Sequence, residues 1–142
     1  MILFNGKLSI ESLPLIHDRG LLNDTDILRL DEPSGEVARI LTQGEARYIA
    51  YVEFAPTDAP VIRGNHYHIR RSEYIYVVSG EVESYFLDLE TGGRYEQVLR
   101  RGDLVLQKPG CVHAYVARAF ATAIEYSPDA LDLTDRVMHR IV

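Results

Sequence analysis

Cysteine is almost absent from this sequence of 142 residues, since Cys111 is the only one. A single thiol cannot form an internal disulfide. The opening stretch MILFNGKLSIES lacks the basic start, long apolar segment and small-residue cleavage site of a signal peptide. No apolar run approaches the roughly 18 residues of a membrane span. We therefore predict a soluble protein of the reducing cytoplasm that has no membrane partner.

Positive charge is also scarce, with 15 basic against 21 acidic residues and a formal net charge of −6. A nucleic-acid binder that gathers phosphates needs a basic face, so this balance argues against nucleic acid as a partner. Only the stretch RGNHYHIRR brings several cations together. That stretch leaves room for a local anion pocket, and the partner we predict is a small-molecule substrate.

Internal repeats, low-complexity segments and long amphipathic helical patterns are missing as well, which favours one compact domain over residues 1–142. What the sequence has instead is a series of short segments rich in Val, Ile, Leu, Tyr and Phe, separated by turn clusters such as ETGG and KPG. This spacing predicts an all-β fold of antiparallel strands. Exposed strand edges must be closed or covered, so we expect a jelly-roll barrel and a homodimer. The segments are residues 47–54, 73–78, 82–89, 95–99, 104–107, 114–117 and 121–126.

Histidines are concentrated in one spaced pattern. His66 and His68 lie two positions apart, so in a strand both project from the same face. The IRRS turn brings Glu73 alongside, and the Pro-Gly turn before His113 brings a further imidazole. A lone histidine is most often structural, but three histidines with a glutamate indicate a metal site. Such ligands suit a divalent ion such as Zn, Fe, Mn or Ni and leave open positions on it.

These residues resemble the two sequence motifs of the cupin superfamily. The first motif, HxH followed by Glu and Gly, is matched by HYHIRRSEYIYVVSG at residues 66–80. The second is matched by GDLVLQKPGCVH at residues 102–113, with Lys108 in place of its first proline. The resemblance implies a double-stranded β-helix, the jelly-roll cupin barrel, formed by a single cupin domain. It also implies that a metal ion is held inside by His66, His68, Glu73 and His113.

A narrower resemblance points to sugar nucleotides. LPLIHDRGLL is similar to a segment of the cupins that act as 3,5-epimerases and ketoisomerases on 4-keto deoxysugars. RGNHYH resembles the C-terminal cupin domain of capsular-polysaccharide-assembling proteins, which act on a UDP-linked 4-keto hexose and hold zinc. The resemblance implies an epimerase or isomerase that abstracts a proton next to the ketone of a nucleotide-linked 4-keto sugar.

Such a reaction needs an acid and a base close to the sugar ring, together with cations for the diphosphate. Tyr115 lies two residues beyond His113 and is the first candidate proton donor, and Tyr126 is the second. Aromatic packing inside the barrel is the alternative role of both tyrosines. For the diphosphate, proximity to the motifs selects three guanidinium groups, although exposed surface positions are the common alternative for arginine. They are Arg19, Arg63 and Arg70.

Two other functions use the same ligands and stay open from the sequence. One is an Fe(II)- or Mn(II)-dependent dioxygenase, which also uses three histidines and a glutamate with open positions for O₂ and substrate. The other is a non-catalytic cupin that binds a small molecule. The DRG segment and RGNHYH favour sugar chemistry over both.

Overall fold

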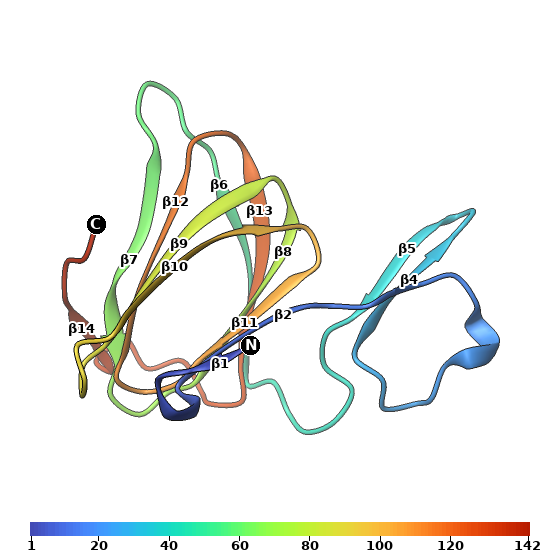
Figure 1. Cartoon of the computed structure of the whole chain (residues 1–142), viewed down its shortest axis with the longest axis horizontal. Coiled ribbons are helices and arrows are strands. Elements are labelled where there is room, and N and C mark those ends of the chain that lie inside the picture. Colours follow the sequence, from blue (N-terminus) through green and yellow to red (C-terminus); the bar gives the residue numbers. More distant parts are fainter.

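The computed structural model describes residues 1–142, with the exception of the side chain of Leu21. Two β-sheets face each other and form a barrel, and a third, smaller sheet projects to one side (Figure 1). In spatial order the larger sheet contains β1 (Ile2–Leu3), β2 (Leu8–Ser12), β11 (Asp103–Gln107), β8 (Glu73–Ser79), β13 (Ala121–Ser127) and β6 (Tyr48–Phe54). The facing sheet contains β10 (Arg94–Arg100), β9 (Glu81–Asp88), β12 (Cys111–Ala117), β7 (Val61–His68) and β14 (Arg136–Met138).

The projecting sheet belongs to a segment that we call the arm, residues 13–44. It contains β3 (Leu15–Ile16), β4 (Leu28–Glu32) and β5 (Gly35–Arg39), in that order. The arm also contains the 3₁₀ helix η2 (Arg19–Leu21), which lies at its outer end, whereas the 3₁₀ helix η1 (Phe4–Gly6) belongs to the barrel (Figure 1). No helix among the described residues has the length and hydropathy to span a membrane.

The all-β, jelly-roll prediction is confirmed, and the segments predicted as strands correspond to β6, β8, β9, β10, β11, β12 and β13. The two barrel sheets are held together by a core of alternating inward side chains. Leu8, Val77, Leu99 and Val105 are fully buried in it, and Phe86 is almost so. Apolar burial of this kind stabilises the fold by roughly 1.5–3 kcal/mol per large side chain.

A β-bulge interrupts the pairing of β7 with β12. His66 pairs with His113 and Gly64 pairs with Ala114, so Asn65 is the extra residue on β7. Both Gly64 (φ +94°) and Asn65 (φ +56°) have positive φ, which glycine and asparagine tolerate better than other residues. Because the bulge adds one residue to β7, inward-facing side chains before and after it are an odd number of positions apart. Regular alternation would give an even number.

Glycine at position 64 is required by space as well as by conformation. A Cβ atom there would lie 2.6 Å from the backbone oxygen of His113. Gly92, in the turn between β9 and β10, has φ +75° but nothing within 4 Å of such a Cβ. The two glycines therefore share the backbone conformation and differ in the close contact.

We predict that Gly64→Ala destabilises the protein more than Gly92→Ala does. Both variants carry the left-handed strain of roughly 1–2 kcal/mol, but only Gly64→Ala also pushes β12 away from β7, at about 1–3 kcal/mol more. Urea unfolding at pH 7 measures the difference. Equal losses of unfolding free energy would mean that the strands do not approach as described.

Candidate metal and substrate site

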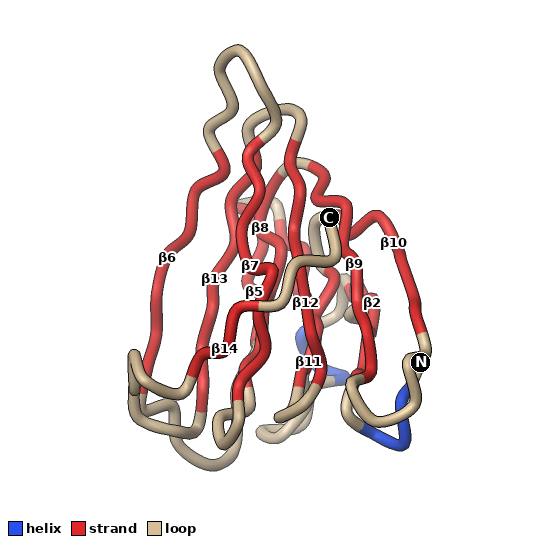
Figure 2. The backbone as a smooth tube through the Cα atoms, turned by 90° about the vertical axis from the view of Figure 1, so that its left-hand side faces the viewer, coloured by secondary structure: helices blue, strands red, loops and turns tan.

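A cavity of about 450 Å³ lies between the two barrel sheets. Its walls come from β6, β8 and β13 on one side, from β7 and β12 on the other, and from the C-terminal segment. Figure 2 shows β14 and the C-terminal residues running along β7. The side chains that line the cavity include Tyr48, Arg63, His66, His68, Arg71, Glu73, His113, Tyr115, Glu125, Asp132 and Arg136.

Three imidazoles meet on the β7–β12 wall of the cavity. His66 and His113 are paired across the two strands, with ring centroids 4.6 Å apart. His68 lies two positions along β7, and its centroid is 5.6 Å from that of His113. Ligand nitrogens of the three rings all lie within 4.8 Å of one another. The i, i+2 pair on one strand thus meets a third histidine from the neighbouring strand.

The imidazoles have the protonation and the free lone pairs that a cation needs. Burial lowers the pKa of His113 from 6.5 to about 3 and that of His66 to about 4, so both rings are neutral at pH 7. The Nδ1 atom of His113 lies 3.1 Å from the backbone oxygen of Cys111 and donates to it. His113 Nε2 and both ring nitrogens of His68 are buried without a hydrogen-bond partner. These orphaned nitrogens fit a divalent ion.

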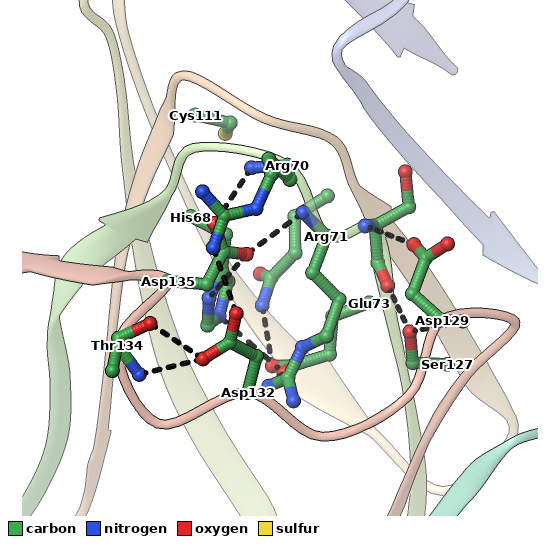
Figure 3. Close-up of polar contacts among 12 residues, drawn as sticks. His68, Arg70, Arg71, Glu73, Cys111, Ser127, Asp129, Asp132, Thr134 and Asp135 are labelled. Atoms are coloured by element: carbon green, nitrogen blue, oxygen red, sulfur yellow. Dashed lines mark hydrogen bonds and ion pairs between the residues drawn. The ribbon is translucent and has the colours of Figure 1, made fainter.

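Glu73 lies beside this histidine group, on the opposite sheet. The loop of residues 69–72 crosses from β7 to β8, so Glu73 faces His68 across the barrel, with 3.5 Å between Oε2 and Nε2. Its Oε2 accepts from Arg71 Nη2 at 2.5 Å (Figure 3) and its Oε1 from Gln107 Nε2 at 2.9 Å. Hydrogen bonds from these two donors therefore fix the carboxylate next to His68.

A second glutamate, Glu125, also lines the cavity. Burial and the negative charge of Glu73 raise the pKa of Glu125 from 4.5 to about 8. Burial alone would raise the pKa of Glu73 too, but His68, His113 and Arg71 lower it to about 2. The two carboxyl groups consequently differ at pH 7, because Glu73 is ionised and Glu125 holds a proton.

The structure separates the two tyrosine candidates. Tyr115 lines the cavity and donates from its hydroxyl to Gln107 Oε1 at 2.5 Å, and burial raises its pKa well above 10. Tyr126 does not reach the histidines. It lines a separate cavity of about 340 Å³ beneath the arm, stacks on Tyr74 and donates to the backbone oxygen of Ile40. Tyr126 faces away because its neighbour on β13, at position 125, faces inward.

The three arginine candidates also have different positions. Arg63 lines the cavity, which the bulge of β7 makes possible. Arg70 is exposed and forms an ion pair with Asp132 at 2.7 Å, so it is not part of the cavity wall. Arg19 lies in η2 and is paired with Glu32 inside the arm, so within one chain it is not brought to the cavity.

Sequence reasoning missed Glu125 and the two donors to the Glu73 carboxylate, Arg71 and Gln107. A glutamate inside the apolar strand ATAIEYS is a signal for a functional or paired charge, and it was available in the sequence. Arg71 and its neighbour Arg70 lie in a loop without a repeating pattern, so nothing in the sequence says which one turns inward.

A comparison with family models finds a match for residues 50–123, just over half of the chain, to the family described as the cupin domain. The chain belongs to the cupin family. The motifs that suggested the family, together with the barrel, are thereby confirmed. No curated protein matches the sequence of this cupin.

Solved structures show the same fold at low sequence identity. A 3,4-ketoisomerase from Helicobacter canadensis has a TM-score of 0.70 and 13% identity, with 92% of this cupin and 89% of that chain covered. The 3,5-epimerase RmlC from Legionella pneumophila has a TM-score of 0.69 and 14% identity, with 97% and 75% covered. The capsular polysaccharide assembling protein CapF from Staphylococcus aureus has a TM-score of 0.61 and 16% identity, with 82% and 33% covered. This cupin thus corresponds to about a third of CapF.

We predict that the metal-free protein loses about 1 kcal/mol of unfolding free energy between pH 7 and 8. Glu125 has a higher pKa in the folded state, so its stabilising contribution is lost as the pH rises towards 8. His66 and His113 have lowered pKa values, so their stabilising contribution is lost as the pH falls through 6.5 and changes little above pH 7. Glu125→Gln should flatten the dependence, whereas Glu11→Gln, on an exposed position of β2, should retain it. Chemical denaturation at several pH values tests this, and a flat parent curve would contradict it.

Proposed function

We propose that this cupin is an enzyme that epimerises or isomerises a nucleotide-linked 4-keto sugar. The observation that carries the proposal is the pairing, across one cavity of about 450 Å³, of neutral imidazoles with two carboxyl groups of opposite protonation state. Support comes also from the ketoisomerase and the epimerase that share the fold.

We further propose a divalent metal ion, Zn, Fe, Mn or Ni, as the cofactor. His66, His68 and His113 would hold it, with Glu73 as the neighbouring carboxylate. When bound, such an ion supplies a Lewis acid for the developing negative charge of an enolate. Arg71 and Gln107, the two donors to that carboxylate, keep it directed towards the histidines.

Glu125 and Tyr115 are the acid–base pair of the proposal. They lie on β13 and β12, which belong to opposite sheets, so they line opposite walls of the cavity. Glu125 is the base of the pair, because its pKa of about 8 leaves a fraction of the molecules with an ionised carboxylate near neutral pH. The raised pKa of Tyr115 keeps its hydroxyl protonated. A base on one face of a sugar ring and an acid on the other is the arrangement that epimerisation needs.

Arg63 is the cation that we assign to the diphosphate of the substrate. It lines the cavity, and one Nη atom already donates to the backbone oxygen of Glu53, while its guanidinium packs over the ring of Phe54. These contacts orient the guanidinium, which can bind phosphate oxygens in a fork. Arg70 is held by acidic partners, and Arg19 would contribute only from another position of the arm or from a second chain.

The direct test is proton exchange at the carbon next to the ketone. We expect a dTDP-linked 4-keto-6-deoxyhexose incubated with the protein in D₂O to lose its ring proton signal in NMR. Glu125→Gln and Tyr115→Phe should each slow the exchange by roughly 10²–10⁴-fold. The control Tyr85→Phe, on β9 and outside the cavity wall, should exchange at the parent rate.

Two further measurements, made alongside the exchange experiment, distinguish the alternative functions. Oxygen consumption by the iron-loaded protein without proton exchange would favour the Fe(II)- or Mn(II)-dependent dioxygenase, for which the three histidines also provide ligands. Thermal stabilisation by the sugar nucleotide with neither reaction would favour a non-catalytic binding cupin. Either result would overturn the isomerase proposal.

We also propose that the chain forms a homodimer. β6 is an edge strand, and its outward side chains Ile49 and Tyr51 are 67% and 63% exposed. Adjacent large apolar side chains on an open edge favour contact with another protein surface. Light scattering should then give twice the chain mass of 16.1 kDa, and a monomer mass at micromolar concentration would contradict the proposal.

A further inference from the structure

The C-terminal segment, residues 129–142, is attached to the strand that carries two of the histidines. β14 pairs with β7 so that Arg136 lies opposite His68 and Met138 opposite His66. The backbone amides of residues 141 and 142 donate to the side-chain oxygen of Asn65, the bulge residue. The free edge of β7 is therefore covered, directly behind the histidines, by a segment that none of the cupin motifs includes.

Asp135 is the buried acidic residue of this segment, with only 1% of its surface exposed. Its Oδ1 and Oδ2 accept the backbone amides of Arg70 and Arg71, each at 2.9 Å (Figure 3). The same Oδ2 lies 3.9 Å from Nδ1 of His68. Asp135 thus connects the end of β7 and the loop after it to the imidazole ring.

The ring of His68 lies between two carboxylates. Nε2 faces Glu73 at 3.5 Å and Nδ1 faces Asp135 at 3.9 Å, and both nitrogens are buried without a hydrogen-bond partner. A neutral imidazole carries one N–H and one lone pair, so the two nitrogens need different partners. A shift of about 1 Å brings Nδ1 within hydrogen-bond distance of Asp135.

We propose that Asp135 is a positioning residue that accepts the Nδ1–H of His68 and so directs the lone pair of Nε2 into the cavity. The inference rests on the proposed metal site. Histidines that bind metals typically donate their other N–H to an acceptor of this kind. Asp135 also anchors the 69–72 loop, so one side chain fixes both the rotation of the ring and the backbone that carries it.

Asp129 provides a matched control. Its Oδ2 accepts the backbone amide of Ser72 at 3.0 Å, so it anchors the same loop from the same C-terminal segment. It has no contact with His68 among the described side chains. Asp135→Asn and Asp129→Asn therefore both weaken the loop anchor, because each exchanges a carboxylate oxygen for an amide NH₂ group, and only Asp135→Asn removes a carboxylate from beside the imidazole.

The experiment measures the Zn²⁺ affinity of the full chain by chelator competition at pH 7. We expect Asp135→Asn to lose 10–100-fold in affinity and Asp129→Asn to stay within about threefold of the parent, because a loop anchor alone does not orient the ring. If the asparagine variant does not fold, Asp135→Glu takes its place in the experiment. It retains the carboxylate and should have most of the Zn²⁺ affinity of the parent.

A second readout needs no metal and no variant. The ¹⁵N chemical shifts of His68 in the metal-free parent should show the Nδ1–H tautomer. The Nε2–H tautomer, or equal zinc affinity in Asp135→Asn and the parent, would overturn the inference and leave the metal site standing. A parent that binds no Zn²⁺ would overturn the metal proposal itself. If that parent still shows the Nδ1–H tautomer, Asp135 positions His68 without a metal.

Discussion

In β7 the chain makes one local departure from regular alternation, and the site depends on it. The bulge at Gly64 and Asn65 lets His66 pair with His113 while Arg63, three residues earlier, also faces the cavity. Regular alternation would turn one of these two side chains outward. The close approach of β7 to β12, which excludes a Cβ at position 64, fixes the spacing of the imidazoles. The RGNHYH stretch thus encodes backbone geometry as much as ligands.

The second constraint is electrostatic. Burying the carboxylate of Glu73 is unfavourable unless donors compensate it, and Arg71 and Gln107 do so. Burial, together with that fixed negative charge, raises the pKa of the neighbouring Glu125, which keeps its proton near neutral pH. The guanidinium of Arg71 itself packs 5.3 Å over the ring of Tyr48. The ionised Glu73 and its buried surroundings therefore favour the protonated form of Glu125.

Much of the fold could be predicted from the sequence, because β-branched and aromatic segments between turn clusters mark strands directly. The placement of His66 and His68 on the same face of one strand followed from the two-residue period of a strand. The facing position of Glu73 did not, because the loop after β7 changes sheets and the sequence does not show this. Likewise, which of two neighbours on β13 faces inward depends on register, so the sequence suggested Tyr126 as the second candidate proton donor, whereas Glu125 lines the cavity. That residues 1–142 form a single domain stays a prediction.

The most direct measurement is X-ray absorption spectroscopy of the zinc-loaded protein. The account predicts three imidazole nitrogens at about 2.0–2.1 Å from the ion, and loss of one of them in a His113→Ala variant. A spectrum dominated by water and carboxylate oxygens, or one unchanged by that substitution, would show that the three rings do not meet on a cation.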